Sequence, residues 1–200
     1  GEDLALVVRP GDCIALSGDL GAGKTALSRA LIRALADEPD LEVPSPTFTL
    51  VQTYETRIPV SHFDLYRLGD ESELEELGLS EALERGIALI EWPDRAGALL
   101  PRETIRIDIR HEGEGRRLTV ERASERFSDR LTRVIAIRQF LDSRGYGKAE
   151  RRFLTGDSSF RAYERIRTAD GRKFVLMDSP ARSNGPPIRD GKPYSQIARL

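Results

Sequence analysis

An eight-residue segment, GDLGAGKT at positions 18–25, has the residue types and spacing of a loop that holds phosphate groups. Its glycines allow the backbone to curl so that several N–H groups point at one phosphate, aided by the N-terminus of the following helix. Lys24 would then reach the β and γ phosphates, and the Thr25 hydroxyl would be a ligand of Mg²⁺. An ordinary glycine turn is the alternative. The predicted nucleotide-binding residues of this loop are Gly18, Asp19, Leu20, Gly21, Ala22, Gly23, Lys24, Thr25 and Ala26.

Phosphoryl transfer also needs an acidic group for the metal and a group that orients the nucleophile. Glu91 ends the apolar run in GIALIEW, and Asp64 lies in HFDLY. Because parallel strands end at the ligand crevice, we expect Glu91 to belong to the site rather than to be a polar exit to solvent; for Asp64 the pattern alone leaves both readings open. Thr47 is a candidate for the γ phosphate or Mg²⁺, or else a plain strand residue. Trp92 is a candidate for stacking on a base or partner, or else for the core.

The elements expected around these residues are those of an α/β domain. Residues 13–17, CIALS, form an apolar run that predicts a buried strand, and leucines at four-residue spacing predict a helix over about 25–36. Strand, glycine loop and helix in this order are what a nucleotide-binding motif requires. In the segment 43–54, Pro44 and Pro46 stiffen the entry and the rest is predicted to be a strand. Further predicted elements are strands over 59–68 and 86–92, short helices over 70–78 and 80–85, and an antiparallel hairpin that turns at 112–115.

Charge divides the chain into two parts. The formal net charge is -2, but residues 1–120 hold 13 Lys and Arg against 23 Asp and Glu, whereas residues 121–200 hold 18 against 10. This asymmetry predicts two modules, at 1–122 and 128–200, with a polar linker around 121–127. The acidic part is a poor candidate for binding nucleic acid by itself, because Lys and Arg dominate contacts with phosphates. The basic part is a candidate for such binding, but its arginines are dispersed among apolar residues, so a solvated surface is the alternative that we favour there.

Composition and cysteine usage indicate a protein of the reducing cytoplasm. No apolar run approaches the roughly 18 to 20 residues that span a bilayer, and no signal-peptide pattern opens the chain, so we expect no membrane association. Cys13 is the single cysteine, which excludes an internal disulfide. Neither Cys13 nor His111 has partners at metal-ligand spacing, so we expect no zinc site. His62, beside Phe63, is expected to be structural or interfacial.

The order of the motifs is more specific than the phosphate loop alone. GDLGAGKT is followed by VPSPTFTLV with Tyr54, then by HFDLYRL, an EEL–LG segment and IEWPD. This order resembles the TsaE (YjeE-type) ATPase family of bacterial tRNA N6-threonylcarbamoyladenosine biosynthesis, over about residues 5–122. The resemblance implies a three-layer P-loop NTPase fold with a mixed, mainly parallel sheet. One departure is that the family's leading helix and first strand are largely absent before Leu4, so we expect an incomplete adenine side of the pocket.

The resemblance also implies an activity and its partners. The family hydrolyses ATP with Mg²⁺ while associated with the TsaB–TsaD pair, which attaches threonylcarbamoyl to adenosine 37 of ANN-decoding tRNAs. A family member is similar to a small regulatory ATPase. It does not make the modification itself, but repeated cycles of the modification require it. Contact with tRNA is therefore expected only indirectly, through the complex.

Roles follow from the positions that match the family's motifs. Thr47 matches the threonine of the PTF switch segment, and Asp64 matches the aspartate of the H-x-D-L-Y-R-L segment. Glu91 and Trp92 match the I-E-W segment. We expect Thr25, Thr47 and Asp64 to help hold Mg²⁺ and Glu91 to polarise the attacking water, with the division between the two acids left open. The implied catalytic residues are Lys24, Asp64 and Glu91; the implied metal-binding residues are Thr25, Thr47, Asp64 and Glu91; Trp92 joins the nucleotide-binding set.

The second part has a resemblance of its own. Its predicted elements are a helix and two strands, at 128–143, 160–168 and 173–178. FLTGDSSFRAYERI followed by GRKFVLMDSP is similar to the start of an aminoglycoside-phosphotransferase-like kinase, closest to amino-sugar kinases, over about 128–200. The resemblance implies a partial α+β kinase N-lobe that is inactive here, because the catalytic aspartate and the C-lobe would lie beyond Leu200. Met177 and Asp178 stand where the kinase plan places a phosphate-pairing lysine, and Lys173 lies too early.

Three functional hypotheses follow. The leading one is a Mg²⁺-dependent ATPase that serves tRNA modification. The second is a bifunctional fusion whose full-length C-terminal part phosphorylates an amino sugar of the N-acetylmuramate or N-acetylglucosamine type, with the phosphate-loop part as a regulator. The third is a nucleotide-binding interaction module without turnover.

Overall fold

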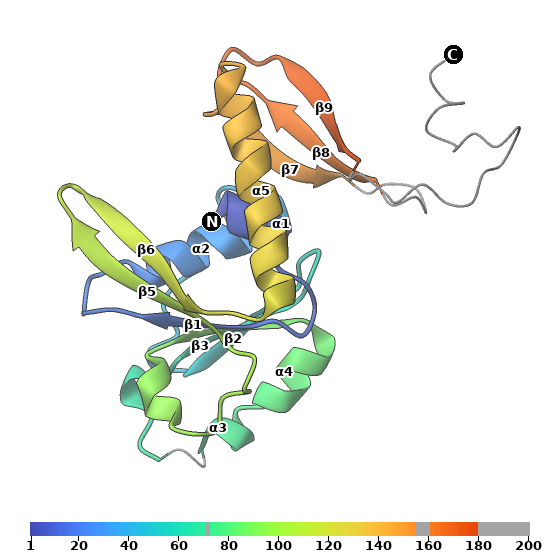
Figure 1. The fold of residues 1–200 in the computed structure, drawn as a ribbon. Coiled ribbons are helices and arrows are strands. Elements are labelled where there is room, and N and C mark those ends of the chain that lie inside the picture. Colours follow the sequence, from blue (N-terminus) through green and yellow to red (C-terminus); the bar gives the residue numbers. More distant parts are fainter. Residues whose placement is uncertain (71–72, 155–160, 180–200) are drawn as a thin grey trace, which may run out of the picture.

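The computed structural model describes residues 1–70, 73–154 and 161–179, which form two β-sheets (Figure 1). The larger sheet has six strands in the order β2-β3-β4-β1-β5-β6, and the smaller has three in the order β7-β8-β9. None of the helices within these ranges is long and apolar enough to cross a bilayer. The strands are β1 (Cys13–Ser17), β2 (Val51–Tyr54), β3 (Val60–Asp64), β4 (Ile87–Glu91), β5 (Ile105–Glu112), β6 (Gly115–Arg122), β7 (Glu150–Leu154), β8 (Ala162–Arg167) and β9 (Lys173–Asp178).

The larger sheet is mixed and mainly parallel. β1 pairs in parallel with β4 on one side and β5 on the other, and β3 pairs in parallel with β4. The edge strands β2 and β6 run antiparallel to their neighbours. The predicted α/β class with a mainly parallel sheet is therefore confirmed.

Helices cover both faces of this sheet, because its central strand is apolar on both sides. Ile14 and Leu16 of β1 point into a core shared with α1 and α2, whereas Cys13 and Ala15 point into a second core shared with α3 and α4. Successive strand residues alternate between faces, so a fully apolar strand requires a layer on each side. The three layers that result agree with the prediction. The helices are α1 (Glu2–Val7), α2 (Lys24–Ala36), α3 (Glu73–Glu76), α4 (Leu79–Arg85) and α5 (Glu125–Ser143), with 3₁₀ turns η1 (Leu65–Arg67) and η2 (Pro93–Ala96).

Three glycines of the phosphate loop, Gly18, Gly21 and Gly23, have positive φ angles that L side chains rarely adopt, and two of them lie next to other elements. Gly18 has a φ of 137°, and a Cβ there would lie 2.4 Å from the carbonyl oxygen of Ile109 in β5. Gly23, with a φ of 109°, directly precedes the first residue of α2. Glycine has no Cβ and takes up these conformations without strain. The loop can therefore pass from β1 into α2 while it stays in contact with β5.

Two predicted strands are shorter than expected. The strand predicted at 59–68 ends at Asp64, because the side chain of Asp64 caps the first turn of η1. Of the strand predicted after the two prolines in 43–54, only β2 forms. The preceding residues instead direct the hydroxyls of Ser45 and Thr47 toward Asp64. Both differences therefore arise from contacts that end at the same carboxylate.

The prediction of a polar linker at 121–127 is wrong. β6 continues to Arg122 and α5 begins at Glu125, which leaves two residues between them. Ser124 is the N-cap of α5, and its hydroxyl oxygen accepts the backbone N–H of Phe127 at 3.3 Å. The polar residues in this stretch thus belong to a strand end and a helix cap.

Two elements had no recognised signal in the sequence. α1 has six residues, too few for helical periodicity to stand out, yet its last three residues are buried. The family's leading helix was expected to be largely absent from the start of the chain, and α1 is a short helix at that place. The sequence has no apolar pattern for β7, because the residue on its buried face is an arginine. This residue, Arg151, has an exposed fraction of 1%.

Helix α5 belongs to two cores. Phe127 and Val134 are buried in the core shared by α1, α2 and the larger sheet. Further along the helix, Ile137 and Leu141 pack with Ile166 of β8 in a separate cluster. The division of the chain into two modules remains a prediction, and α5 is the element that both parts share (Figure 1).

Ion pairs connect the smaller sheet to α1. Arg151 donates two hydrogen bonds to Glu164 of β8, at 2.7 and 2.8 Å. It also donates to Asp3 of α1 and to the carbonyl oxygen of Val134, both at 3.1 Å. Asp3 accepts two further hydrogen bonds from Arg138 of α5, at 2.6 and 3.2 Å. These contacts satisfy a fully buried guanidinium group.

We predict that Glu164→Gln lowers the free energy of unfolding by about 3 kcal/mol, because removal of one partner from a buried pair leaves the other charge uncompensated. Asp3, 3.1 Å from Arg151, limits the loss. Glu112→Gln, which breaks an exposed pair with Arg117, is the control and should cost less than about 1 kcal/mol. Urea unfolding followed by circular dichroism measures both, and equal losses would contradict the prediction.

Candidate functional site

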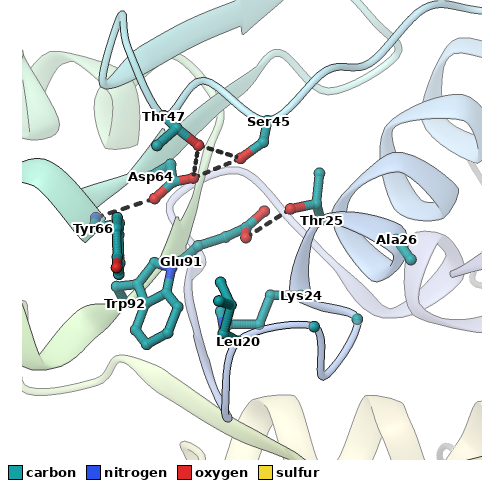
Figure 2. A pocket seen from close by; sticks show the side chains of 12 residues that line it. Leu20, Lys24, Thr25, Ala26, Ser45, Thr47, Asp64, Tyr66, Glu91 and Trp92 are labelled. Atoms are coloured by element: carbon teal, nitrogen blue, oxygen red, sulfur yellow. Dashed lines mark hydrogen bonds between the residues drawn. The ribbon is translucent and has the colours of Figure 1, made fainter.

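A pocket of about 330 Å³ lies where β1, β3 and β4 end (Figure 2). The predicted loop residues that line it are Leu20, Gly21, Gly23, Lys24, Thr25 and Ala26. The predicted residues that line it from other segments are Thr47, Asp64, Glu91 and Trp92. The remaining predicted residues, Gly18, Asp19 and Ala22, border a second hollow of about 620 Å³ on the β5 side of the loop.

Lys24 is held inside the loop, with an exposed fraction of 5%. Its ammonium group donates to the carbonyl oxygens of Gly18 and Asp19 at 2.7 and 2.9 Å. It also lies 3.6 Å from the ring centroid of Trp92, a distance typical of a cation–π contact. Burial lowers the pKa of Lys24, and the nearby carboxylates, led by Glu91, oppose that shift. The lysine is therefore a poorly hydrated charge at the centre of the loop.

The backbone of Trp92 is left-handed, with a φ of 59°. This conformation is rare for a bulky residue and is a form of strain often found at functional sites. The chain turns here from β4 into η2, so Glu91 lines the pocket while the next side chain covers Lys24. The ring of Tyr66 packs against the indole with centroids 5.1 Å apart. An aromatic wall therefore closes one side of the pocket (Figure 2).

Glu91 is buried and is contacted by three side chains. The Thr25 hydroxyl donates to Oε2 at 2.9 Å (Figure 2). The other oxygen, Oε1, lies 2.8 Å from Nε2 of His62 and 3.2 Å from Oγ of Ser28. Several donors are what a buried carboxylate requires. The acid at the end of β4 is thereby connected to the first turn of α2.

Asp64 forms a second, separate cluster. Its Oδ2 accepts hydrogen bonds from Ser45 at 2.5 Å and Thr47 at 2.7 Å, and its Oδ1 accepts the backbone N–H of Tyr66 at 3.1 Å. Asp64 and Glu91 are direct partners in the register of β3 and β4, so both side chains leave the sheet on the same face. The structure thus brings the two predicted acids to one pocket, each with its own hydroxyl donors.

The pocket offers hard oxygen ligands. Hydroxyl and carboxylate oxygens suit Mg²⁺ better than softer metals. Within the described parts of the chain, no group of three or more His, Cys, Asp and Glu residues could hold a metal ion by itself. Mg²⁺ usually binds through one or two carboxylates together with substrate phosphates. The residues present therefore fit a Mg²⁺ ion that arrives with a nucleotide.

Four residues of the site were not predicted from the sequence: Ser28, Ser45, His62 and Tyr66. Period-two alternation places His62 on the same face of β3 as Asp64, so that signal was available. Ser28 lies one turn after Lys24 on the buried side of α2, which helical spacing could have indicated. Ser45 and Tyr66 lie outside strands and helices of regular period, and no pattern pointed to them.

The loop, the helix N-terminus and the strand-end acids converge as the binding of a nucleotide's phosphates requires. This arrangement defines the chain as a P-loop nucleotide-binding protein. Residues 1–119 match the family described as "Threonylcarbamoyl adenosine biosynthesis protein TsaE". The chain therefore belongs to the TsaE family, whose members have a role in the biosynthesis of threonylcarbamoyladenosine in tRNA.

Individual relatives agree with this assignment. A tRNA threonylcarbamoyladenosine biosynthesis protein TsaE from Rickettsia felis is 41% identical over 116 residues, which is 58% of this chain and 67% of that protein. The corresponding protein of Bacillus subtilis is 39% identical over 56% of this chain and 70% of its own length. The crystal structure of YdiB from Bacillus subtilis matches with a TM-score of 0.55 and 28% identity, over 68% of this chain and 85% of that chain.

We predict that a nucleotide with Mg²⁺ changes the fluorescence of Trp92, the single tryptophan of the chain, because phosphates draw the Lys24 ammonium group away from the indole. Lys24→Met removes the charge and keeps the length of the side chain, so in this variant nucleotide should leave the emission unchanged. A fluorescence titration measures the effect. Unchanged wild-type emission at a nucleotide concentration that equilibrium dialysis shows to be saturating would contradict the prediction.

Proposed function

We propose that the chain binds ATP with Mg²⁺ and hydrolyses it, and that this hydrolysis serves the threonylcarbamoylation of adenosine 37 in tRNA. In this proposal the chain acts with the TsaB–TsaD pair and reaches tRNA only through that complex. Membership of the TsaE family supports the place in tRNA modification. The hydrolytic step is argued from the pocket.

The observation that carries the proposal is the hydrogen bond from the Thr25 hydroxyl to Oε2 of Glu91, at 2.9 Å. A hydroxyl group has one hydrogen and two lone pairs. Because the hydrogen is donated to Glu91, the lone pairs of Thr25 remain for a cation. Glu91 ends β4, the parallel neighbour of β1, so it stands beside the loop that follows β1. This geometry supports an acid acting at the phosphates that the loop binds.

The other residues have roles that follow from charge and position. Lys24 supplies a poorly hydrated positive charge for the β and γ phosphates, where charge develops during transfer. The residues that would hold Mg²⁺ are Thr25 together with Thr47, Asp64 and Glu91. The bound ion would neutralise charge on the β and γ oxygens. Trp92 and Tyr66 form an aromatic wall along one side of the pocket.

Two divisions of labour between the acids are open. In the first, Asp64 and Thr47 bind the metal and Glu91 polarises the attacking water. In the second, Glu91 acts at the metal through Thr25, and Asp64 orients the loop that carries Thr47. The direct bond between Thr25 and Glu91 supports the second division, and the two hydroxyl groups already bonded to Asp64 are consistent with it.

Lys24→Ala should reduce ATP hydrolysis by roughly 100-fold or more, because a positive charge aimed at the developing negative charge is lost. Lys148→Ala, which removes an exposed lysine outside the pocket, is the matched control and should leave the rate unchanged. The measurement is phosphate release by the chain alone and after stepwise addition of TsaB–TsaD and tRNA. Stimulation by TsaB–TsaD is expected. Unaltered ATP binding and tRNA modification by Lys24→Ala would overturn the proposal, and binding without turnover would indicate an interaction module.

The isosteric variants Glu91→Gln and Asp64→Asn separate the two divisions of labour. If Glu91 acts at the metal, Glu91→Gln should raise the Mg²⁺ concentration for half-maximal hydrolysis by roughly 10- to 100-fold. Asp64→Asn should then lower kcat at saturating Mg²⁺ and shift the Mg²⁺ requirement much less. Mg²⁺ titrations of the hydrolysis rate give both quantities, and the reverse pattern would assign the metal to Asp64.

A second candidate function is the transfer of phosphate to an amino sugar by a longer chain. One observation supports it. An antiparallel sheet, β7-β8-β9, follows α5, as expected for the start of a kinase N-lobe. The GDSS segment that would form its phosphate loop, at 156–159, lies outside the described residues. Asp178 pairs with Arg133, and Lys173 begins β9, so the described part of this strand has no lysine at its centre. Transfer of labelled phosphate to N-acetylmuramate by the full-length chain would establish this activity.

A further inference from the structure

His62 is buried beside the pocket and has no role in the chemistry described so far. It lies on β3 two residues before Asp64, so it leaves the sheet on the same face. Its side chain has an exposed fraction of 0%. Its Nε2 lies 2.8 Å from Oε1 of Glu91 on the neighbouring strand β4. A fully buried histidine in contact with a candidate catalytic acid requires an explanation.

The hydrogen-bond partners decide which ring nitrogen of His62 carries a hydrogen. Nδ1 has no partner among the described residues. An N–H group at that position would be buried without an acceptor, which is costly. A carboxylate can only accept, so the nitrogen that faces Glu91 must donate. His62 therefore donates its Nε2–H to Oε1 of Glu91.

Ser28 approaches the same oxygen from α2. Its Oγ lies 3.2 Å from Oε1 of Glu91 and 3.0 Å from the carbonyl oxygen of Lys24. The other oxygen of the carboxylate, Oε2, meets the Thr25 hydroxyl that lines the pocket. The two oxygens of Glu91 thus have different surroundings, one in the protein interior and one at the phosphate loop.

We propose that His62 is a positioning residue that holds Glu91 with Oε2 alone turned toward the pocket. The terminal torsion of a glutamate side chain is broad and roughly two-fold, so an unrestrained carboxylate samples several orientations. The Nε2–H bond, made between two adjacent strands, selects one of them. The inference rests on the proposed hydrolysis, in which Glu91 acts through Oε2.

This role predicts which kinetic quantity changes. The affinity for nucleotide depends on the phosphate loop and Lys24, and His62 contacts neither of them directly in any described hydrogen bond. A misoriented Glu91 would instead slow the step in which the acid acts. Loss of the Nε2–H bond should therefore raise the Mg²⁺ concentration for half-maximal hydrolysis if Glu91 acts at the metal, or lower kcat if Glu91 polarises the attacking water. In both cases it should leave the Kd for the nucleotide, measured without Mg²⁺, unchanged.

Two variants of His62 form a matched pair. The amide nitrogen of glutamine reaches the place of Nε2, whereas the shorter asparagine reaches only the place of Nδ1. With TsaB–TsaD present, His62→Gln should keep hydrolysis within about 3-fold of wild type, whereas His62→Asn should lose roughly 10- to 100-fold, the usual effect of removing a group that orients a ligand or catalytic side chain. The Kd for ATP, measured without Mg²⁺, should stay the same in both. His111→Gln, at the other histidine, should change neither quantity.

A measurement on the unmodified protein tests the hydrogen bond without any assay of activity. The chain has two histidines, His62 and His111, so ring-nitrogen NMR spectra of ¹⁵N-labelled protein are simple, and His111→Gln assigns them. We expect His62 to carry its hydrogen on Nε2, with a proton that exchanges slowly with water. Glu91→Gln should shift this proton to higher field, because a neutral acceptor forms a weaker bond than a carboxylate.

The outcomes distinguish this inference from the proposed hydrolysis. An Nε2 of His62 that carries no hydrogen, or equal activities of His62→Gln and His62→Asn in a protein that hydrolyses ATP, would overturn the positioning role. A wild-type chain that fails to hydrolyse ATP with TsaB–TsaD would overturn the proposed hydrolysis, and the NMR result would then decide the His62–Glu91 bond alone. If His62→Asn does not fold, as circular dichroism would show, the NMR measurement on the wild-type chain still decides.

Discussion

One buried carboxylate, that of Glu91, connects the elements on which the pocket depends. Its backbone belongs to β4, its Oε2 accepts from the first turn of α2, and its Oε1 contacts both α2 and β3. A charged group removed from water needs several hydrogen bonds, and here they come from elements that are distant in the sequence. The position of the phosphate loop relative to the strand ends is therefore set by the requirements of a single side chain.

The features that the sequence predicted are those with local causes. An apolar run, a glycine loop and leucines at helical spacing identified β1 and α2, because each signal lies within one element. Glu91 and Asp64 were predicted because parallel strands end at one edge of a sheet and because the motif order resembles that of a family. The structure adds that both acids face the same pocket.

The features that escaped prediction depend on contacts between distant segments. Ser45 gains its place only because the loop before β2 folds back on Asp64. His62 resembles any polar strand residue until β4 is placed beside it. The buried face of β7 was not predicted, because its buried residue is Arg151 and a charged side chain normally indicates an exposed position. In each case a polar group is held by partners that periodicity along one element does not reveal.

The helix α5 lies beyond the part of the chain that matches the family, which stops at residue 119. Its Phe127 and Val134 nevertheless complete the core of that part. A family member without such a helix needs other side chains at this place, or leaves apolar surface in contact with water. Removal of α5 from this chain would therefore uncover part of the core beside the larger sheet, so the helix contributes to the stability of the part that matches the family.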